Sequence, residues 1–229
     1  MEVRITSLVE GARNAEGLTV IIDVFRCFTT EAVAFENGAE KIILVSEIEE
    51  AFALKDKGVG DFLMGEVGGK RPNGFDFGNS PYELSNRNLK GKTIVQSTRA
   101  GTVGVIAAGE SDVLYGGSLA VAKATVKVIE RLDPDIVTLV AMGLEGRIRS
   151  DEDEQCALYM RNLLQGRQPP KDAVKSLIRV GEESQKYDDE SKPQWPEQDR
   201  EMALDIDSHD FALKIVNENG LFIARPEYL

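Results

Sequence analysis

Short apolar runs alternate with segments of helical character along most of this chain. Six runs are rich in Ile, Leu and Val, and stretches with helical periodicity or helix-start signals lie between them. Strands that alternate with helices at short intervals are typical of an α/β protein with a largely parallel sheet. We expect strands at 18–23, 41–45, 61–65, 93–97, 112–116 and 135–143, and helices at about 29–37, 46–58, 102–109, 118–132 and 152–165.

Two regions break this alternation. Residues 66–92 are too irregular for a simple connector, although Ser80-Pro81 followed by Glu83 predicts a capped helix start. Residues 182–207 contain ten acidic and three basic residues, which predicts a solvated acidic connector with a short helix near 198–204. We interpret residues 1–229 as one α/β domain that includes this connector.

The C-terminal segment F-A-L-K-I-V-N-E-N-G-L-F-I-A-R-P has two apolar runs around Asn-Gly and predicts a hairpin. Such a hairpin could offer a sheet edge at 211–225 to a second copy of the chain, so a homodimer is one expectation.

Charge and composition exclude several classes of function. The net charge of −12 argues against nucleic acid and anionic membrane surfaces as partners. No apolar stretch reaches the roughly 20 residues of a membrane helix, and no signal peptide is recognisable, so we expect a cytoplasmic protein. Cys27 and Cys156 have apolar neighbours and are interpreted as buried free thiols.

The single histidine, His209, limits the chemistry further. A His-rich zinc site is excluded, and a Ser-His-Asp triad would depend on this one residue. Any metal must therefore be held mainly by oxygen ligands, which points to Mg²⁺.

Polar residues follow most of the predicted strands. In open α/β sheets, ligands bind beyond the carboxyl ends of the strands, and we expect these residues to share one edge of the sheet. They are Asp23 and Arg26, Glu66, the segment S-T-R-A-G-T at 97–102, G-G-S at 116–118 and G-L-E-G-R-I-R-S-D-E-D at 143–153.

The segment 97–102 has the composition of an anion-binding loop. Its hydroxyls and free N–H groups at a helix start suit a phosphate, Gly101 permits close approach, and Arg99 could add a forked donor. The alternative is an ordinary capped helix after a strand. The turn that contains Ser118 is a second, weaker candidate of the same kind.

Five acids form the other half of the expected site: Asp23, Glu66, Asp76, Glu152 and Asp153. Converging carboxylates could hold Mg²⁺ against a substrate phosphate. Each acid also has a structural alternative. Glu152 and Asp153 could compensate a helix dipole, and Asp76 could be a turn residue. Asp23 could pair with Arg26 or cap the following helix.

Five ordered blocks of this chain resemble the 2-phosphosulfolactate phosphatase family. They are V-I-I-D-V-F-R-C-F-T-T-E-A-V, L-M-G-E-V-G-G-K-R-P-N-G-F-D-F-G-N-S-P-Y-E-L, G-K-T-I-V-Q-S-T-R-A-G-T, G-G-S-L-A-V-A and G-L-E-G-R-I-R-S-D-E-D-E-Q-C-A, between about residues 18 and 165. The family often reads T-T-N-G-T where this chain reads S-T-R-A-G-T, so the resemblance leaves the exact acid substrate open.

The resemblance implies a three-layer α/β/α fold and a Mg²⁺-dependent phosphatase that acts on 2-phosphosulfolactate, a step in coenzyme M biosynthesis. On this chain we assign Asp23, Arg26 and Asp76 to catalysis, and Asp23, Glu66, Glu152 and Asp153 to the metal. Substrate and phosphate binding is assigned to Asn79, Ser97, Thr98, Arg99, Gly101, Thr102 and Ser118. Either water or a carboxylate could attack phosphorus. The alternative function is a non-catalytic binding protein for a phosphorylated or sulfonated metabolite.

Overall fold

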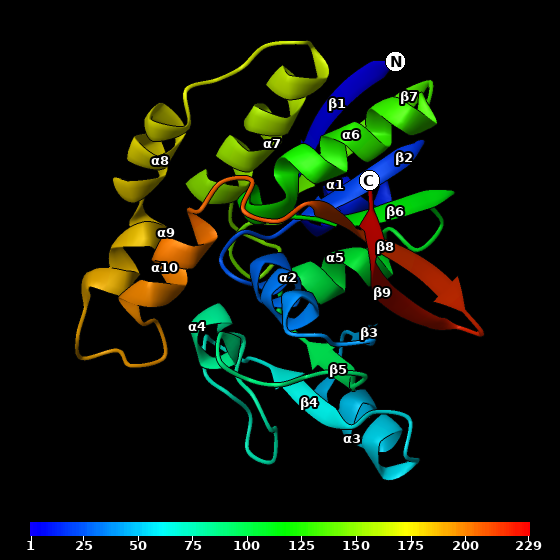
Figure 1. Ribbon diagram of the computed structural model, residues 1–229, viewed down its shortest axis with the longest axis vertical. Helices are drawn as coiled ribbons and strands as arrows, with labels where there is room; N and C mark the ends of the chain where they lie inside the picture. The colour runs from blue at the N-terminus through cyan, green and yellow to red at the C-terminus, as the bar shows by residue number, and fades with distance from the viewer.

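The computed structural model describes residues 1–229 and contains a single nine-stranded sheet with helices on both faces (Figure 1). This confirms the predicted α/β class. In chain order the strands are β1 (Glu2–Ser7), β2 (Leu18–Ile22), β3 (Lys41–Val45), β4 (Phe62–Gly65), β5 (Thr93–Ser97), β6 (Val113–Gly117), β7 (Ile136–Ala141), β8 (Phe211–Glu218) and β9 (Leu221–Tyr228). Their order across the sheet is β1-β7-β2-β6-β8-β9-β3-β5-β4.

The C-terminal hairpin β8–β9 lies in the middle of the sheet and joins two parallel groups of strands. β1, β7, β2 and β6 form one group, and β3, β5 and β4 form the other. The pairings β6–β8, β8–β9 and β9–β3 are all antiparallel. The strands of the two groups therefore run in opposite directions. One expectation is therefore wrong: the hairpin offers no free sheet edge to a partner. Although the two groups run antiparallel, strand ends from both meet, because the N–H of Gly101, shortly after β5, donates to Asp23 after β2.

Helices fill both sides of this sheet. They are α1 (Leu8–Arg13), α2 (Cys27–Glu36), α3 (Ile48–Asp56), α4 (Pro81–Leu84), α5 (Gly101–Ala107), α6 (Ala122–Leu132), α7 (Asp151–Leu164), α8 (Lys171–Arg179), α9 (Glu182–Gln185) and α10 (Glu197–Ala203), with short 3₁₀ turns η1 (Leu119–Val121) and η2 (Lys186–Asp188). In Figure 1, α2 and α5 lie between the two strand groups. Their buried Phe28 and Val105 share one core cluster with Ile21 of β2 and Ile94 of β5.

The other faces of the two groups are covered by different helices. Val126 of α6, Met160 of α7 and Ile178 of α8 pack in a cluster with Val20 of β2. Ala51 of α3 packs in a smaller cluster over β3, β4 and β5. The helices that follow the strands begin within two residues of their predicted starts, except that α6 is preceded by η1. Sequence reasoning missed β1, α1 and α8, which lie outside the most regular apolar runs.

Local start signals gave mixed results. Ser80 caps α4 as predicted, because its Oγ accepts the Glu83 N–H at 3.1 Å and Pro81 occupies the first turn. Glu83 does not close the capping box, since its Oε2 accepts from Gly78 N instead. The helix predicted from residue 46 begins instead after Glu47 as α3, and no side chain caps it. Phe75 is buried, whereas Tyr82 is exposed.

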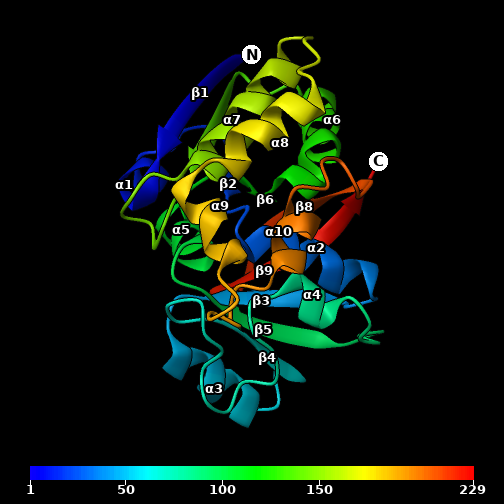
Figure 2. The same cartoon turned by 90° about the vertical axis from the view of Figure 1, so that its left-hand side faces the viewer.

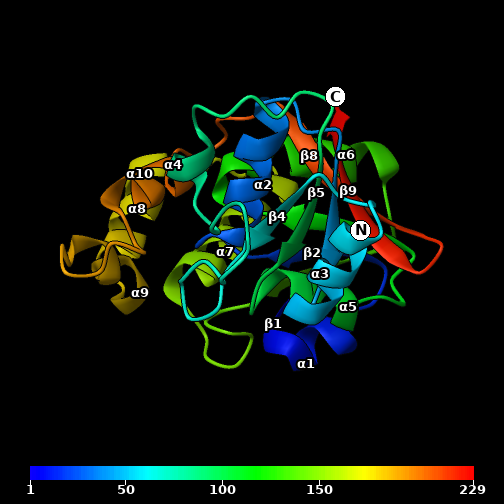
Figure 3. The same ribbon diagram turned by 90° about the horizontal axis from the view of Figure 1, so that it is seen from below.

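Residues 182–207 are more ordered than a solvated connector. The segment contains α9, η2 and α10, and it buries Ser184, Tyr187, Asp199 and Arg200. Figure 2 shows α8, α9 and α10 running in front of β2 and α2, and in Figures 1 and 3 α10 lies beside α4. The predicted short helix is confirmed, but the segment packs against the molecule at the strand ends.

Both cysteines are buried and free, as predicted. None of the helices has the length and apolar character needed to cross a membrane.

Candidate active site

A narrow cleft collects polar side chains from the ends of strands in both groups. It encloses about 70 Å³. Of the predicted site residues it contains Asp23, Arg26, Glu66, Asn79, Arg99, Glu152 and Asp153. Glu145, Glu183 and Trp195 also line it, and sequence reasoning did not select them. The last two come from the segment that was interpreted as a connector.

Asp23 follows the fully buried strand β2 and is itself only 5 % exposed. Its Oδ1 accepts the N–H of Cys27 at 3.1 Å, which caps the first turn of α2, and its Oδ2 accepts the N–H of Gly101 at 2.8 Å. The second bond joins the end of β2 to the start of α5. A Cβ on residue 101 would lie 2.6 Å from Cys27 Sγ and 2.9 Å from Asp23 Oδ2, so this contact requires glycine.

Asp153 and Glu66 join strand ends in the same way. Asp153, in the first turn of α7, accepts from Val24 N at 2.7 Å and from Gly143 N at 2.8 Å. Glu66 follows β4 and accepts from Arg99 N and Gly69 N, both at 2.8 Å. Each carboxylate thus holds two loops together. Because a carboxylate has about four acceptor positions, each also retains lone pairs for a ligand.

Burial and crowding make it costly for Asp23, Glu152 and Asp153 to carry charge. Burial, helped by the charge of Glu66, raises the pKa of Asp23 to about 6. Burial and the charges of Glu183 and Asp23 raise the pKa of Glu152 to about 7. The pKa of Asp153 is well above its ordinary value for the same reason, because Glu152 and Asp23 add to the effect of burial. A cation in the cleft would relieve this repulsion.

The cleft has the donor chemistry that Mg²⁺ requires, although it does not form a complete cage. As the side chains stand, no group of three or more Asp, Glu, His or Cys residues is arranged to hold a metal ion. Mg²⁺ usually needs only one or two protein carboxylates, together with water and substrate phosphate. Asn79, which is 5 % exposed, adds a buried Oδ1 with no hydrogen-bond partner. The residues therefore suit a partly hydrated Mg²⁺ ion.

Arg26 is held by the 182–207 segment and does not pair with Asp23. Its Nη1 lies 2.5 Å from Asp199 Oδ2 and donates to Gln194 O at 2.9 Å, and its Nη2 donates to Gly69 O at 3.3 Å. The alternative of an Asp23–Arg26 ion pair is therefore wrong, whereas the helix-capping alternative for Asp23 is confirmed. Asp199 carries no sequence signal that separates it from the nine other acids around it.

The predicted anion loop divides into two parts. Arg99 lines the cleft, and its Nη2 also donates to Ser46 O at 3.3 Å. Thr98 and Thr102 bond to each other, because Thr98 N donates to Thr102 Oγ1 at 2.9 Å and Thr102 N donates to Thr98 Oγ1 at 3.2 Å. These threonines and Ser97 are buried beside the cleft, not in its lining. The capped-helix alternative thus describes the two threonines.

Two further predicted residues lie away from the cleft lining. Asp76 accepts from Lys55 Nζ at 2.5 Å and from Leu63 N at 2.8 Å, so it joins α3 to β4. Ser118 is fully buried, and its Oγ has no hydrogen-bond partner. Neither residue is part of the cleft lining.

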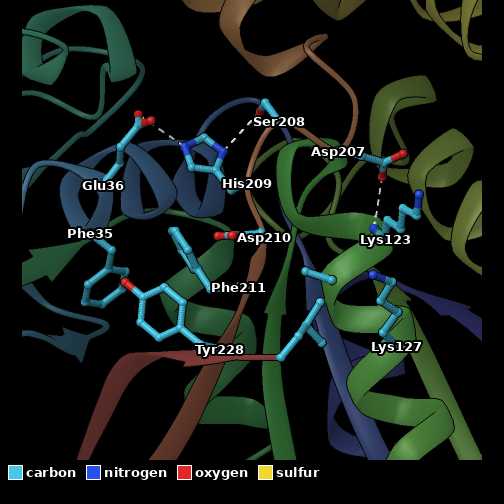
Figure 4. A pocket seen from close by; sticks show the side chains of 12 residues that line it. Phe35, Glu36, Lys123, Lys127, Asp207, Ser208, His209, Asp210, Phe211 and Tyr228 are labelled. Carbon is cyan, nitrogen blue, oxygen red and sulfur yellow. Dashed lines mark hydrogen bonds and ion pairs between the residues drawn. The ribbon is translucent and has the colours of Figure 1, made fainter.

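A larger cavity, of about 600 Å³, lies apart from this cleft (Figure 4). It contains His209 together with Lys123, Lys127 and Tyr228, but none of the strand-end carboxylates. His209 Nδ1 lies 3.0 Å from the Oγ of its neighbour Ser208, and its Nε2 lies 3.4 Å from Glu36 Oε2. The sole histidine is thus remote from the candidate active site.

The fold and the cleft define an α/β protein whose strand ends carry an acidic site with two arginines, an arrangement suited to a small anionic ligand and a cation. Comparison with known proteins agrees with this class. The sequence pattern of the 2-phosphosulpholactate phosphatase family matches residues 4–194. The chain belongs to this family.

Individual relatives support the assignment. The chain is 42% identical over 165 residues to a Carboxydothermus hydrogenoformans protein named "Probable 2-phosphosulfolactate phosphatase", covering 72% of this chain and 68% of the relative. A Bacillus subtilis protein with the same name is 30% identical over 202 residues, which is 86% of each chain. A Thermus thermophilus protein of that name is 36% identical over 137 residues, covering 59% of this chain and 56% of the relative.

Proposed function

We propose that this protein is a Mg²⁺-dependent phosphatase that hydrolyses 2-phosphosulfolactate to sulfolactate and inorganic phosphate. One observation carries the proposal: in a chain of this family, Arg26 and Arg99 line the same cleft as six carboxylates. The arginines attract an anionic ester, and the carboxylates would repel it unless a cation lies between them.

The reaction adds water across the ester P–O bond. The oxygen of water ends on phosphate, and the ester oxygen leaves with a proton as the sulfolactate hydroxyl. Arg26 and Arg99 would bind the negatively charged groups of the substrate and the charge that develops during transfer. Asp23, Glu152 and Asp153 would hold Mg²⁺, which supplies further neutralisation of charge on the phosphoryl group. Glu66 shapes this end of the cleft through its bonds to Arg99 N and Gly69 N.

The test is phosphate release by the purified protein from a panel of small phosphorylated acids, with Mg²⁺ and with excess chelator. We expect turnover of 2-phosphosulfolactate that stops with chelator and returns when Mg²⁺ is added. Isothermal titration with the same compounds gives the necessary comparison. Tight binding without turnover of any compound would contradict the proposal and support the alternative of a metabolite-binding protein.

Three further expectations accompany the proposal. We propose that the reaction belongs to coenzyme M biosynthesis, as the resemblance implies, and that the protein works in the cytoplasm. A homodimer also stays a prediction, but it would need a surface other than the β8–β9 hairpin, because both hairpin strands are paired on each side.

A further inference from the structure

The buried carboxylate of Asp199 is the partner of Arg26, yet it comes from a distant part of the chain. Asp199 is fully buried in α10, and Arg26 is 3 % exposed at the start of α2. The Oδ2 atom of Asp199 lies 2.5 Å from Arg26 Nη1. Its Oδ1 accepts from Ser80 Oγ at 2.7 Å and from Tyr82 N at 3.0 Å. One carboxylate therefore connects α10, the start of α4 and the start of α2.

The contacts of Arg26 leave one part of its guanidinium free. A guanidinium carries five N–H donors. Both donors of Nη1 are used by Asp199 and Gln194 O, and one donor of Nη2 is used by Gly69 O. The Nε–H and one Nη2–H have no protein partner. Nε and Nη2 form one edge of the guanidinium, and such an edge binds two oxygens of a phosphate, sulfonate or carboxylate at once when it turns both of its N–H groups to the ligand.

We propose that Asp199 is a positioning residue for Arg26. By holding the Nη1 side of the guanidinium, it fixes the free Nε–Nη2 edge for an oxyanion of the substrate in the cleft. The proposal rests on the proposed function of Arg26 as an anion-binding residue. It also gives the 182–207 segment a role in the site, because the same segment contributes Gln194 O to Arg26 and Glu183 and Trp195 to the cleft.

A positioning role differs from a purely structural one in what it changes. An Asp199→Asn variant keeps the shape of the side chain and leaves Arg26 charged, but it removes the ionic contact that orients the guanidinium. We expect the inhibition constant of inorganic phosphate and the KM for 2-phosphosulfolactate to rise together, with kcat/KM falling about 10- to 100-fold. A structural role alone would lower the unfolding temperature and leave the KM and the phosphate inhibition constant of the folded fraction unchanged.

The matched control lies on the same helix. Glu201 in α10 pairs with Arg179 at the surface, where the two groups are 2.5 Å apart and both are about half exposed. Glu201→Gln makes the same chemical change outside the cleft, and we expect kinetic constants within about twofold of the wild type. If this control shifts KM as much as Asp199→Asn does, the specific role of Asp199 is wrong.

Two further variants decide the result if Asp199→Asn does not fold. Ser80→Ala removes one donor to Asp199 and leaves the ion pair in place, so it should raise the phosphate inhibition constant by about 2- to 5-fold. In an Arg26→Lys background, Ser80→Ala should then have less than about a twofold effect, because Asp199 acts through Arg26. Equal effects in both backgrounds would overturn the proposal.

Phosphate binding separates this proposal from the proposed function. We would measure it by titration calorimetry with inorganic phosphate and Mg²⁺, using the wild type and the Asp199→Asn and Ser80→Ala variants. If the wild type binds phosphate but hydrolyses no ester, the proposed function fails, and the weakened binding of the variants still supports Asp199. If the wild type hydrolyses the ester and the folded variants bind phosphate normally, the role of Asp199 fails alone. A wild type that neither binds nor hydrolyses overturns both.

Discussion

At the end of β2, Asp23 accepts two backbone N–H groups and lies near Glu66, Glu152 and Asp153. Its two bonds place the carboxylate rigidly, and burial, helped by the charge of Glu66, raises its pKa. We therefore expect Asp23→Asn to reduce kcat for phosphate release by at least about 100-fold, because the charge that would hold Mg²⁺ is lost. Steady-state phosphate release over a range of Mg²⁺ concentrations measures this effect.

Asp76→Asn is the matched comparison, because sequence reasoning gave both residues a catalytic role. Asp76 pairs with Lys55 at a position where both side chains are about one third exposed. Its loss should cost less than about 1 kcal/mol of stability and change kcat by less than about twofold. If Asp76→Asn abolishes turnover while its melting temperature is unchanged, it is wrong to place Asp23 in the active site and Asp76 outside it.

Gly101 permits a close approach between the start of α5 and the end of β2. A methyl group there would meet Cys27 Sγ and Asp23 Oδ2 at 2.6 and 2.9 Å, so Gly101→Ala must displace one of them. We expect a loss of about 1–3 kcal/mol in the free energy of unfolding and a larger loss of activity than that destabilisation explains. Gly91→Ala is the control, because a Cβ there meets nothing within 4 Å. It should lower stability through its positive φ alone and leave turnover intact.

Glu31 gives the protein a pH dependence that is independent of catalysis. This fully buried residue has a pKa well above its ordinary value because of burial, and its Oε2 has no hydrogen-bond partner. The folded state thus binds a proton that the unfolded state releases above about pH 4.5. Its contribution to stability is complete below that pH and is lost as the pH rises, by at most about 1.4 kcal/mol per pH unit.

The substitution Glu31→Gln tests this origin of the pH dependence. We expect it to flatten the fall in unfolding free energy between pH 5 and pH 8, measured by urea denaturation in the presence of chelator. Glu40→Gln at an exposed position should leave the slope unchanged. Parallel curves for the wild type and Glu31→Gln would show that Glu31 is already ionised in the folded state.

At the scale of the element, the 182–207 segment closes one side of the cleft. Trp195 lines the cleft and packs so closely against Gly69 that a Cβ on residue 69 would lie 2.6 Å from the indole ring. We expect Trp195→Ala to raise KM several-fold with a smaller change in kcat, because it opens the wall without touching the carboxylates. Trp195→Phe keeps an aromatic ring and should have an intermediate KM. A variant that lowers kcat alone would contradict this role.

The elements also show how far the sequence was informative. The central strands and most of the helices were predictable, because they follow apolar runs and ordinary stop signals such as Gly38, whose φ is +92°. The packing of residues 182–207 was not. Ten acids in that segment indicate exposure, and the sequence alone does not show that Asp199 has Arg26, Ser80 and Tyr82 as partners. A buried charge is explained only by a partner that is distant in the sequence.

The site, too, could be predicted from the sequence only in part. Strand ends could be recognised, so seven of the predicted residues reach the cleft, including Asp23, Arg26 and Asp153. Asp76, Thr98 and Thr102 are also polar residues near strand ends, like the residues that line the cleft. They differ from the cleft residues only in the direction that their loops take. The reversed sense of the β3-β5-β4 group could not be predicted, because it follows from the pairing of a hairpin more than 100 residues further along the chain.

At the scale of the whole molecule, the β8–β9 hairpin holds the two strand groups together. Leu213 of β8 is fully buried in the main core cluster, so Leu213→Ala should cost about 2–5 kcal/mol in the free energy of unfolding. Val216 on the same strand is 40 % exposed, and its change to Ala should cost less than about 1 kcal/mol. Urea denaturation followed by far-UV circular dichroism gives both values.

The same experiment tests whether the two groups unfold as one unit. The chain has a single tryptophan, Trp195, whose fluorescence reports on the cleft, whereas circular dichroism reports on the whole sheet. We expect the two transitions to coincide in the wild type and in Leu213→Ala. Separate transitions would mean that the groups are independent and that the hairpin only bridges them.

The central place of the hairpin has a consequence for biosynthesis. β6 and β3 pair with strands that are synthesised well after them, since Leu114 meets Ile215 and Ile43 meets Ile223. Until β8 and β9 have been made, the nascent chain carries two open strand edges in its interior, and the long separation of these partners slows their closure. The newly made protein is therefore most exposed to aggregation just before β8 and β9 leave the ribosome, and it is in this interval that a chaperone would be of most use to it.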